Sequence, residues 1–118
     1  MYNGQALLAS LPSSQNHLPA TQEINHGCLE IPDIGINCYI FTAQKPIATN
    51  GWFFERNTFL YGFWLEDFEI AVLEKNYSIP GVDYEIIGDL TPEELRNVIH
   101  CFTNSSVVKR KYKRILME

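Results

Sequence analysis

The sequence contains no apolar run of 18 or more residues, so it predicts no membrane-spanning helix. Its first fifteen residues contain no Lys or Arg and only a short apolar patch. A secretory signal peptide needs a positive region followed by a longer apolar run. These absences predict a protein that stays in the cytoplasm and has no membrane partner.

Cysteine is scarce, with only Cys28, Cys38 and Cys101. An odd number does not suit a disulfide framework, which pairs cysteines in even numbers. We therefore expect reduced thiols, most of them buried as small apolar side chains. His26 beside Cys28, and His100 beside Cys101, also lack the paired spacings of structural zinc sites. No metal site is expected.

Motifs that carry chemistry are missing too. The chain has no phosphate-binding loop, no Gly-x-Gly-x-x-Gly, no Gly-x-Ser-x-Gly and no His-Glu-x-x-His. Its neighbouring carboxylates, such as Asp83 and Glu85, fit a solvated strand face better than a catalytic pair. We predict no catalytic residue, no cofactor and no enzyme. A small enzyme with an unrecognised Cys or acidic site is a remaining alternative, and it requires a deep pocket with perturbed titratable groups.

The composition is that of a folded domain. The chain has 118 residues, of which 46% are hydrophobic and 13% aromatic. This length is in the usual range for one domain and buries roughly 65% of the surface that the unfolded chain exposes. Disordered chains have low hydrophobicity and high net charge, which is the opposite balance.

Short apolar runs interrupted by turn residues predict a mainly antiparallel sheet of about five strands within residues 28–88. Asn50-Gly51 indicates a tight turn. The aromatic run 58–65 predicts a central strand, in which Gly62 indicates a bulge or a close backbone approach. Residues 66–75 fit either a strand or a helix, and we favour a strand. The expected strands are 28–31, 36–43, 58–65, 66–75 and 82–87.

Two helices are predicted after the strands. Thr91, Pro92 and Glu94 form the signature of a capped helix start, and apolar residues recur at helical spacing to Phe102. This pattern predicts a helix over about 92–103, and a second follows over about 106–116. Strands followed by helices indicate the α+β class. Residues 28–118 would form the domain, and residues 1–27 a short helix (4–11) with a loop or arm.

The charge is unevenly distributed. Residues 1–108 carry thirteen acidic and four basic residues, a net charge of −9, whereas residues 109–118 carry +4. An acidic body favours a basic partner and speeds the encounter with it. Aromatic residues crowd positions 52–64, more than one face of a sheet needs, and exposed aromatics serve as anchors in interfaces. The predicted partner-binding residues are Glu55, Trp64, Glu66, Asp67, Glu69 and Glu74.

The basic tail suggests an alternative, a nucleic-acid-associated accessory protein. Its cluster consists of Lys109, Arg110, Lys111, Lys113 and Arg114. Non-specific affinity for nucleic acid follows the number of phosphates that are neutralised, and five charges attached to a body of −9 would bind weakly. A solvated helix face that balances the acidic body is the favoured interpretation, so nucleic acid is not an expected partner.

The small size, acidic body, aromatic-rich sheet and helical end (residues 90–102, LTPEELRNVIHCF) resemble a bacterial toxin-immunity protein. Residues 28–118 carry the resemblance. More narrowly, they resemble the immunity proteins of contact-dependent growth inhibition and related polymorphic toxin systems. Such proteins stay in the cytosol and block a cognate toxin domain, often a basic nuclease, by direct binding. The resemblance implies an inhibitor whose partner is a cognate toxin protein. The sequence does not determine the oligomeric state, and we favour a monomer. The basic tail departs from a purely acidic inhibitor.

Overall fold

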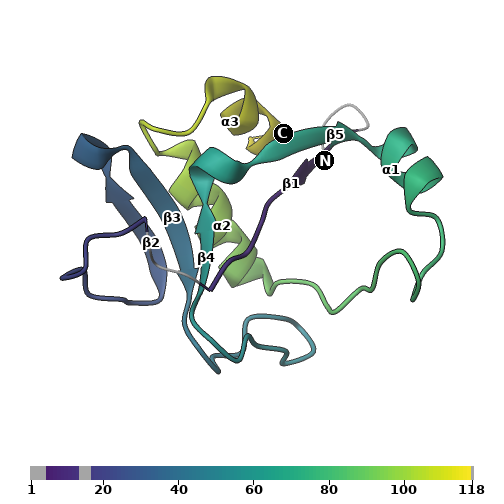
Figure 1. Ribbon diagram of the computed structural model, residues 1–118, viewed down its shortest axis with the longest axis horizontal. Coiled ribbons are helices and arrows are strands. Elements are labelled where there is room, and N and C mark those ends of the chain that lie inside the picture. Colours follow the sequence, from purple (N-terminus) through teal and green to yellow (C-terminus); the bar gives the residue numbers. More distant parts are fainter. Residues whose placement is uncertain (1–4, 14–16, 118) are drawn as a thin grey trace.

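A computed structural model describes residues 5–13 and 17–117, and it confirms the α+β class. Two antiparallel sheets and three α-helices make up this part of the chain (Figure 1). In chain order the elements are β1 (Gln5–Leu8), β2 (Gly27–Ile31), the 3-10 turn η1 (Pro32–Ile34), β3 (Ile36–Phe41), β4 (Thr58–Tyr61), the 3-10 turn η2 (Gly62–Trp64), β5 (Glu66–Glu69), α1 (Ile70–Asn76), α2 (Pro92–Thr103) and α3 (Arg110–Leu116).

The sheets are smaller than predicted. One sheet has three strands in the order β2-β3-β4, and β1 pairs with β5 in a separate two-stranded ribbon. The central strand is therefore β3, whereas β4 lies at an edge. The predicted strand 58–65 is divided because η2 turns the chain at Gly62, so that β4 and β5 enter different sheets. Pro12 still accepts a hydrogen bond from the Phe59 N–H (2.9 Å), which keeps the chain after β1 alongside β4.

Three further predictions are wrong in part. The expected helix 4–11 is a strand over 5–8, because these residues pair with Glu66–Glu69; Gly4 lies outside the described residues. The ambiguous stretch 66–75 begins as strand β5 and continues as helix α1. Its pairing with β1 ends at Gln5–Glu69, and α1 then satisfies the backbone internally. The second terminal helix begins at Arg110 rather than near 106, because Ser105 and Val108 turn inward and are buried.

Strand β3 is buried on both faces. Tyr39 and Phe41 pack against α2 and α3, where Val98, Phe102, Val108, Tyr112 and Ile115 complete one core. Ile36, Cys38 and Ile40 point to the other side and form a second core with Leu18, Phe59 and Tyr61. Each alternate set of side chains of this strand therefore has its own apolar layer.

Two glycines have the roles that their positions suggested. Gly51, with φ 83°, donates its N–H to the Ala48 carbonyl (2.9 Å) and makes the tight turn. Gly62 is the close-approach glycine. A Cβ atom built on it would lie 2.6 Å from Asn37 Oδ1 and 2.8 Å from Val108 Cγ2. Both neighbours are buried, so they have little room to retreat.

Cys28 and Cys101 form a disulfide, which overturns the expectation of reduced thiols. The two positions are 73 residues apart in the sequence, but packing of α2 against β2 brings their Cα atoms to 5.5 Å. Such a pair cannot be recognised from local spacing. Cys38 is a free buried thiol, as predicted, on the opposite face of β3.

In Figure 1 the three-stranded sheet lies on one side of the molecule, with α2 against it and α3 above α2. Strand β5 leads away from this body to α1, and the chain then loops back to the start of α2. No helix in the described ranges is long and apolar enough to cross a membrane.

We expect Gly62→Ala to lower the free energy of unfolding by about 1–3 kcal/mol, the usual cost of overpacking a filled site. The control is Gly88→Ala, whose new Cβ would have the end of the exposed Asn50 side chain as its nearest neighbour. Urea unfolding followed by far-UV circular dichroism measures both. If the two substitutions lowered the free energy of unfolding equally, the result would contradict the close packing of Gly62.

Stability should fall as the pH rises through the alkaline range. Burial raises the pKa of the Cys38 thiol from 9.0 to about 11, and burial likewise raises that of Tyr61 to about 12. Between pH 9 and 11 the unfolded chain has lost the thiol proton that the folded chain retains, so each rise in pH favours unfolding. The measurement is urea unfolding at several pH values, and Cys38→Val should reduce the slope over pH 9–11. If Cys38→Val left this slope unchanged, the result would contradict a raised pKa of Cys38 as its cause.

Candidate partner-binding surface

An arm of the chain, residues 70–90, extends from the body between β5 and α2. It consists of α1 and a loop that turns back on itself at Pro80-Gly81. In this turn Ile79 N–H donates to Asp83 Oδ2 (3.0 Å), and Gly81 N–H donates to the Tyr84 carbonyl (2.7 Å). Within the described chain, the hydrogen bonds found for residues 77–86 all remain inside the arm. The hydrogen bonds described for the middle of the arm are thus local.

The end of the arm is fixed to the turn at residues 47–50. Thr49 N–H donates to the Asp89 carbonyl (2.8 Å), and the Asn50 amide donates to the Ile87 carbonyl (2.9 Å). Ala48 and Leu90 also form an isolated bridge. The arm is therefore anchored at β5 and at this turn, and it spans the distance between them.

The arm exposes an unusual amount of apolar surface. Val82 is 77% exposed and Ile86 78%, although their alternation with Tyr84 predicted a strand over 82–87. That prediction is wrong: apart from the bridge between Pro80 and Tyr84, no strand partner lies beside these residues in the part of the chain that is described. The exposed large apolar side chains of the arm are Val72, Tyr77, Ile79, Val82, Tyr84, Ile86 and Ile87.

Acidic residues surround this apolar surface. Residues 66–93 contain eight acidic residues and one lysine, which leaves a charge of −7. Three of the predicted partner-binding carboxylates, those of Glu66, Glu69 and Glu74, are exposed along β5 and α1. These residues are continuous in the chain with the arm, and we call residues 66–93 the acidic face.

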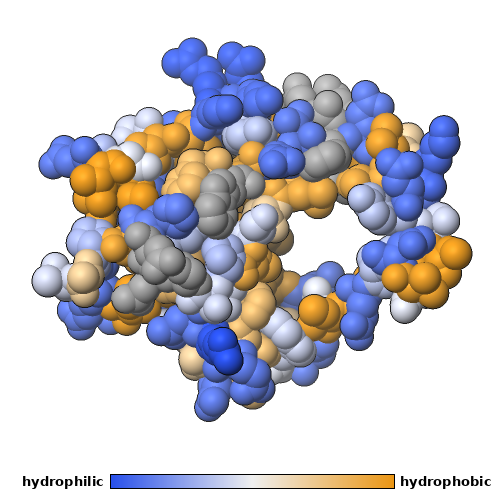
Figure 2. All heavy atoms as spheres, viewed as in Figure 1, coloured by the Kyte–Doolittle hydropathy of each residue, from blue (hydrophilic) through white to orange (hydrophobic). Residues whose placement is uncertain are grey.

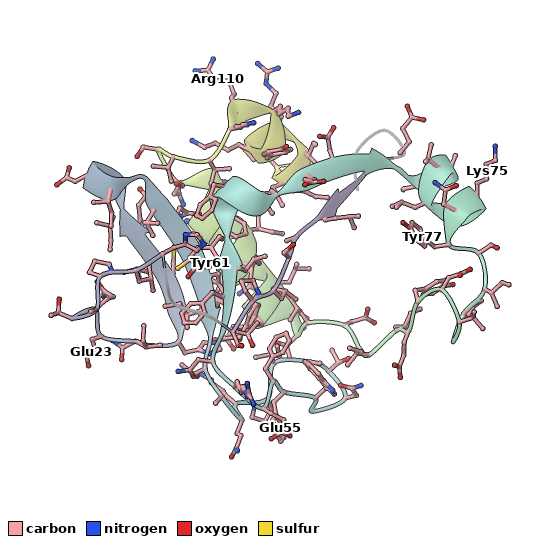
Figure 3. All side chains as sticks on the ribbon, in the orientation of Figure 1. Glu23, Glu55, Tyr61, Lys75, Tyr77 and Arg110 are labelled. Carbon is pink, nitrogen blue, oxygen red and sulfur yellow. A yellow bond between two sulfur atoms is a disulfide. The ribbon has the colours of Figure 1, made fainter. Side chains whose placement is uncertain are left out.

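The other predicted partner-binding residues do not all belong to the acidic face. Glu55 is exposed in the loop before β4, and Figure 3 shows it far from Lys75 and Tyr77 of the arm. Trp64 lies in η2 beside β5, but its side chain is outside the described part of the structure. Asp67 is partly buried and paired.

Among the described residues, one ion pair joins the basic tail to the acidic face. Lys111 Nζ lies 3.4 Å from Asp67 Oδ1, and this carboxylate raises the pKa of Lys111. The side chains of Lys109, Arg110 and Arg114 are exposed, and that of Lys113 is partly buried. Because Lys111 is paired, the five charges predicted as a patch do not form one free surface.

Apolar hollows lie beside β1 and Ala9, and two of them are also lined by residues of the arm. Hollows of about 380 and 320 Å³ share Leu7, Ala9 and Leu60, and a third of about 440 Å³ joins the first at Leu8. We call these three hollows, which share lining residues, the apolar groove. In Figure 2 an opening passes through the molecule between the arm and the body. The groove continues the apolar surface of the arm into the molecule.

Most of the polar chemistry lies at a different place, in an open cleft of about 550 Å³ beside the disulfide. Two residues that line the cleft, Tyr39 and His26, contact the buried Glu94 of α2, which does not line it. Glu94 Oε1 accepts hydrogen bonds from Tyr39 Oη (2.8 Å) and from His26 Nε2. His26 Nδ1 accepts the backbone N–H of Thr42 (3.2 Å), and Nε2 is the ring nitrogen that faces Glu94. Burial and the Glu94 carboxylate raise the pKa of Tyr39, so the phenol remains a donor.

Glu94 therefore differs from its predicted role. Thr91 Oγ1 caps the helix by accepting the Glu94 N–H (3.1 Å), as predicted, but the carboxylate does not return to the Thr91 N–H. That N–H donates instead to the Ile47 carbonyl (2.9 Å). The carboxylate instead accepts hydrogen bonds from Tyr39 and His26, which replace the reciprocal capping bond.

The cleft has an arrangement that could suggest catalysis. Thr42 Oγ1 lies 3.1 Å from His26 Nδ1, and Glu94 holds the other ring nitrogen, which is the atom order of nucleophile, base and orienting acid. However, the Nδ1 lone pair already accepts the Thr42 N–H, and Thr42 does not line the cleft. Within the described ranges no group of three His, Cys, Asp or Glu side chains could hold a metal ion. We interpret the network as one that positions α2.

Comparisons of the chain with protein-family models, with curated proteins and with solved structures find no match. The candidate surface therefore depends on the geometry described above.

Sequence reasoning missed the central part of this surface. The alternation of Val82, Tyr84 and Ile86 was interpreted as a half-buried strand, and a local pattern cannot show whether a partner strand exists. One signal was available: Asp83 and Glu85 occupy the intervening positions, and Pro80-Gly81 precedes them. Turn residues and acids around an isolated apolar segment also suit an exposed binding loop.

We expect Glu94→Ala to lower the free energy of unfolding by about 3 kcal/mol, because it leaves the buried Tyr39 hydroxyl and His26 ring without their acceptor. Glu93→Ala is the matched control, since Glu93 is exposed in the same helical turn. Its loss should be below about 1 kcal/mol, the size of a helix-dipole effect. Urea unfolding of the three proteins provides the comparison. Equal losses at the two positions would show that the network does not hold α2.

Proposed function

We propose that this protein is an immunity-type inhibitor that binds and neutralises a basic toxin domain through its acidic face. The observation that carries the proposal is the arm, which exposes large apolar side chains within a segment of charge −7. Exposed apolar groups contribute most of the binding energy in protein interfaces, and acidic groups around them attract a basic partner. The resemblance in overall character to toxin-immunity proteins supports the same function.

The other features fit this proposal in different ways. Since Lys111 is paired with Asp67, the basic tail offers less to nucleic acid than its sequence suggested. The Cys28–Cys101 disulfide is typical of oxidising compartments, whereas the resemblance implies the cytoplasm. Binding through the acidic face requires neither location.

The first step of the test identifies the partner. The full chain is used to isolate binding proteins from its native cells, and each recovered protein is then expressed in bacteria with and without the chain. We expect a basic protein that arrests growth and whose effect the chain relieves. A recovered protein that binds but never affects growth would contradict the immunity function.

We expect the triple variant Glu66→Lys, Glu69→Lys, Glu74→Lys to associate with the purified partner about tenfold more slowly or worse, because electrostatic steering is lost. The control triple Glu23→Lys, Asp33→Lys, Glu55→Lys changes the net charge equally at exposed sites outside the acidic face. Asp67 is left intact because its replacement would also break the Lys111 pair. Surface plasmon resonance at low and high salt measures the rates.

The comparison between the two triple variants decides the location of the interface. Equal slowing by both would show that only the net charge acts. Slowing by the control triple alone would place the partner on another face of the molecule.

A further inference from the structure

The two-stranded ribbon leaves one edge of β1 unpaired within the described chain. Strand β1 pairs with β5 alone, so alternate residues of β1 direct their N–H and C=O groups away from β5. In Figure 1 β1 lies between β5 and the opening beneath the arm. An open strand edge is a template for pairing with another chain.

Apolar surface lies directly beside this edge. Leu7, Leu8 and Ala9 line the apolar groove, and Leu8 is 40% exposed. Ile87 and Leu90 of the arm line the same space. A strand added next to β1 would thus direct alternate side chains into the groove and the others towards solvent.

The charges at the rim select the kind of strand. Glu74 borders the groove beside Leu8, and the arm carries Asp83, Glu85 and Asp89, all exposed. An inserted segment would have its solvent-facing side chains among these carboxylates. Basic side chains at those positions would be attracted, whereas acidic ones would be repelled.

We propose that the apolar groove accepts an extended segment of the partner, with apolar and basic residues alternating, which adds a third strand to the β1–β5 ribbon. This inference depends on the proposed function, since the segment belongs to the basic partner. Backbone hydrogen bonds to β1 give affinity, the groove selects apolar side chains, and the acidic face selects the basic ones.

The test uses a fluorescent synthetic peptide in which valine and lysine alternate over about eight residues. Two control peptides accompany it: one has glutamate in place of lysine, and the other has methylated backbone nitrogens along the edge that would face β1. The proteins are the full-length chain, Leu8→Glu, and Ile34→Glu. Ile34 is the matched control because it is exposed and apolar but does not line the groove.

Fluorescence anisotropy gives the dissociation constants. We expect Leu8→Glu and the methylated peptide each to weaken binding about tenfold or more, the effect of losing one or two hydrogen bonds or an apolar contact. Ile34→Glu should change the dissociation constant by no more than about twofold, which is too small to reflect a lost contact. Glutamate in place of lysine should abolish binding. New amide protection over residues 5–9 in hydrogen exchange would locate the added strand.

The following results would overturn the inference. Equal binding of the methylated peptide would exclude strand addition, and equal binding to Leu8→Glu would exclude the groove. Light scattering that shows a dimer, with Leu8→Glu monomeric, would make a second copy of this chain the occupant. If the peptide fails but the acidic-face triple variant still slows association with the purified partner, this inference falls while the proposed function stands. If the triple variant has no effect either, both fall.

Discussion

Glu94 carries a carboxylate into the space between α2 and the three-stranded sheet, where it accepts hydrogen bonds from Tyr39 and His26. A charge in such a place is stable only when its partners are in position, so it fixes the distance and the rotation of α2 relative to β3. The apolar core around Phe102 and the Cys28–Cys101 disulfide require the same placement of α2. The polar network, the apolar core and the disulfide therefore all specify the same position of α2 on the sheet.

This firmly held body has a less constrained extension. Strand β3 is buried on both faces, and α2 and α3 cover one of them. The arm, by contrast, is anchored at its ends and held in the middle by its own turn. A rigid body that presents an exposed segment is a common arrangement in binding proteins, because the body positions the segment while the segment itself remains accessible. The proposed inhibitor function uses both parts.

The structure also relates two charged regions that the sequence presented as alternatives. The acidic face and the basic tail meet at the pair between Asp67 and Lys111. The tail's Tyr112 and Ile115 are buried against the body, so α3 is part of the core rather than a separate appendage. The acidic residues of the arm have no comparable basic helix in their own segment, which is why the arm keeps its charge.

The sequence by itself determined the α+β class, both strands at 27–41, the capped helix from Pro92 and the acidic balance, because these depend on local patterns and on composition. Tertiary structure decided what local patterns cannot contain. Whether Val82–Ile87 is a strand depends on a neighbour, the bond between Cys28 and Cys101 depends on packing across 73 residues, and the role of Glu94 depends on two donors from distant segments. The acidic carboxylates of β5 and α1 were identifiable from sequence, but their union with an exposed apolar arm is a property of the folded chain.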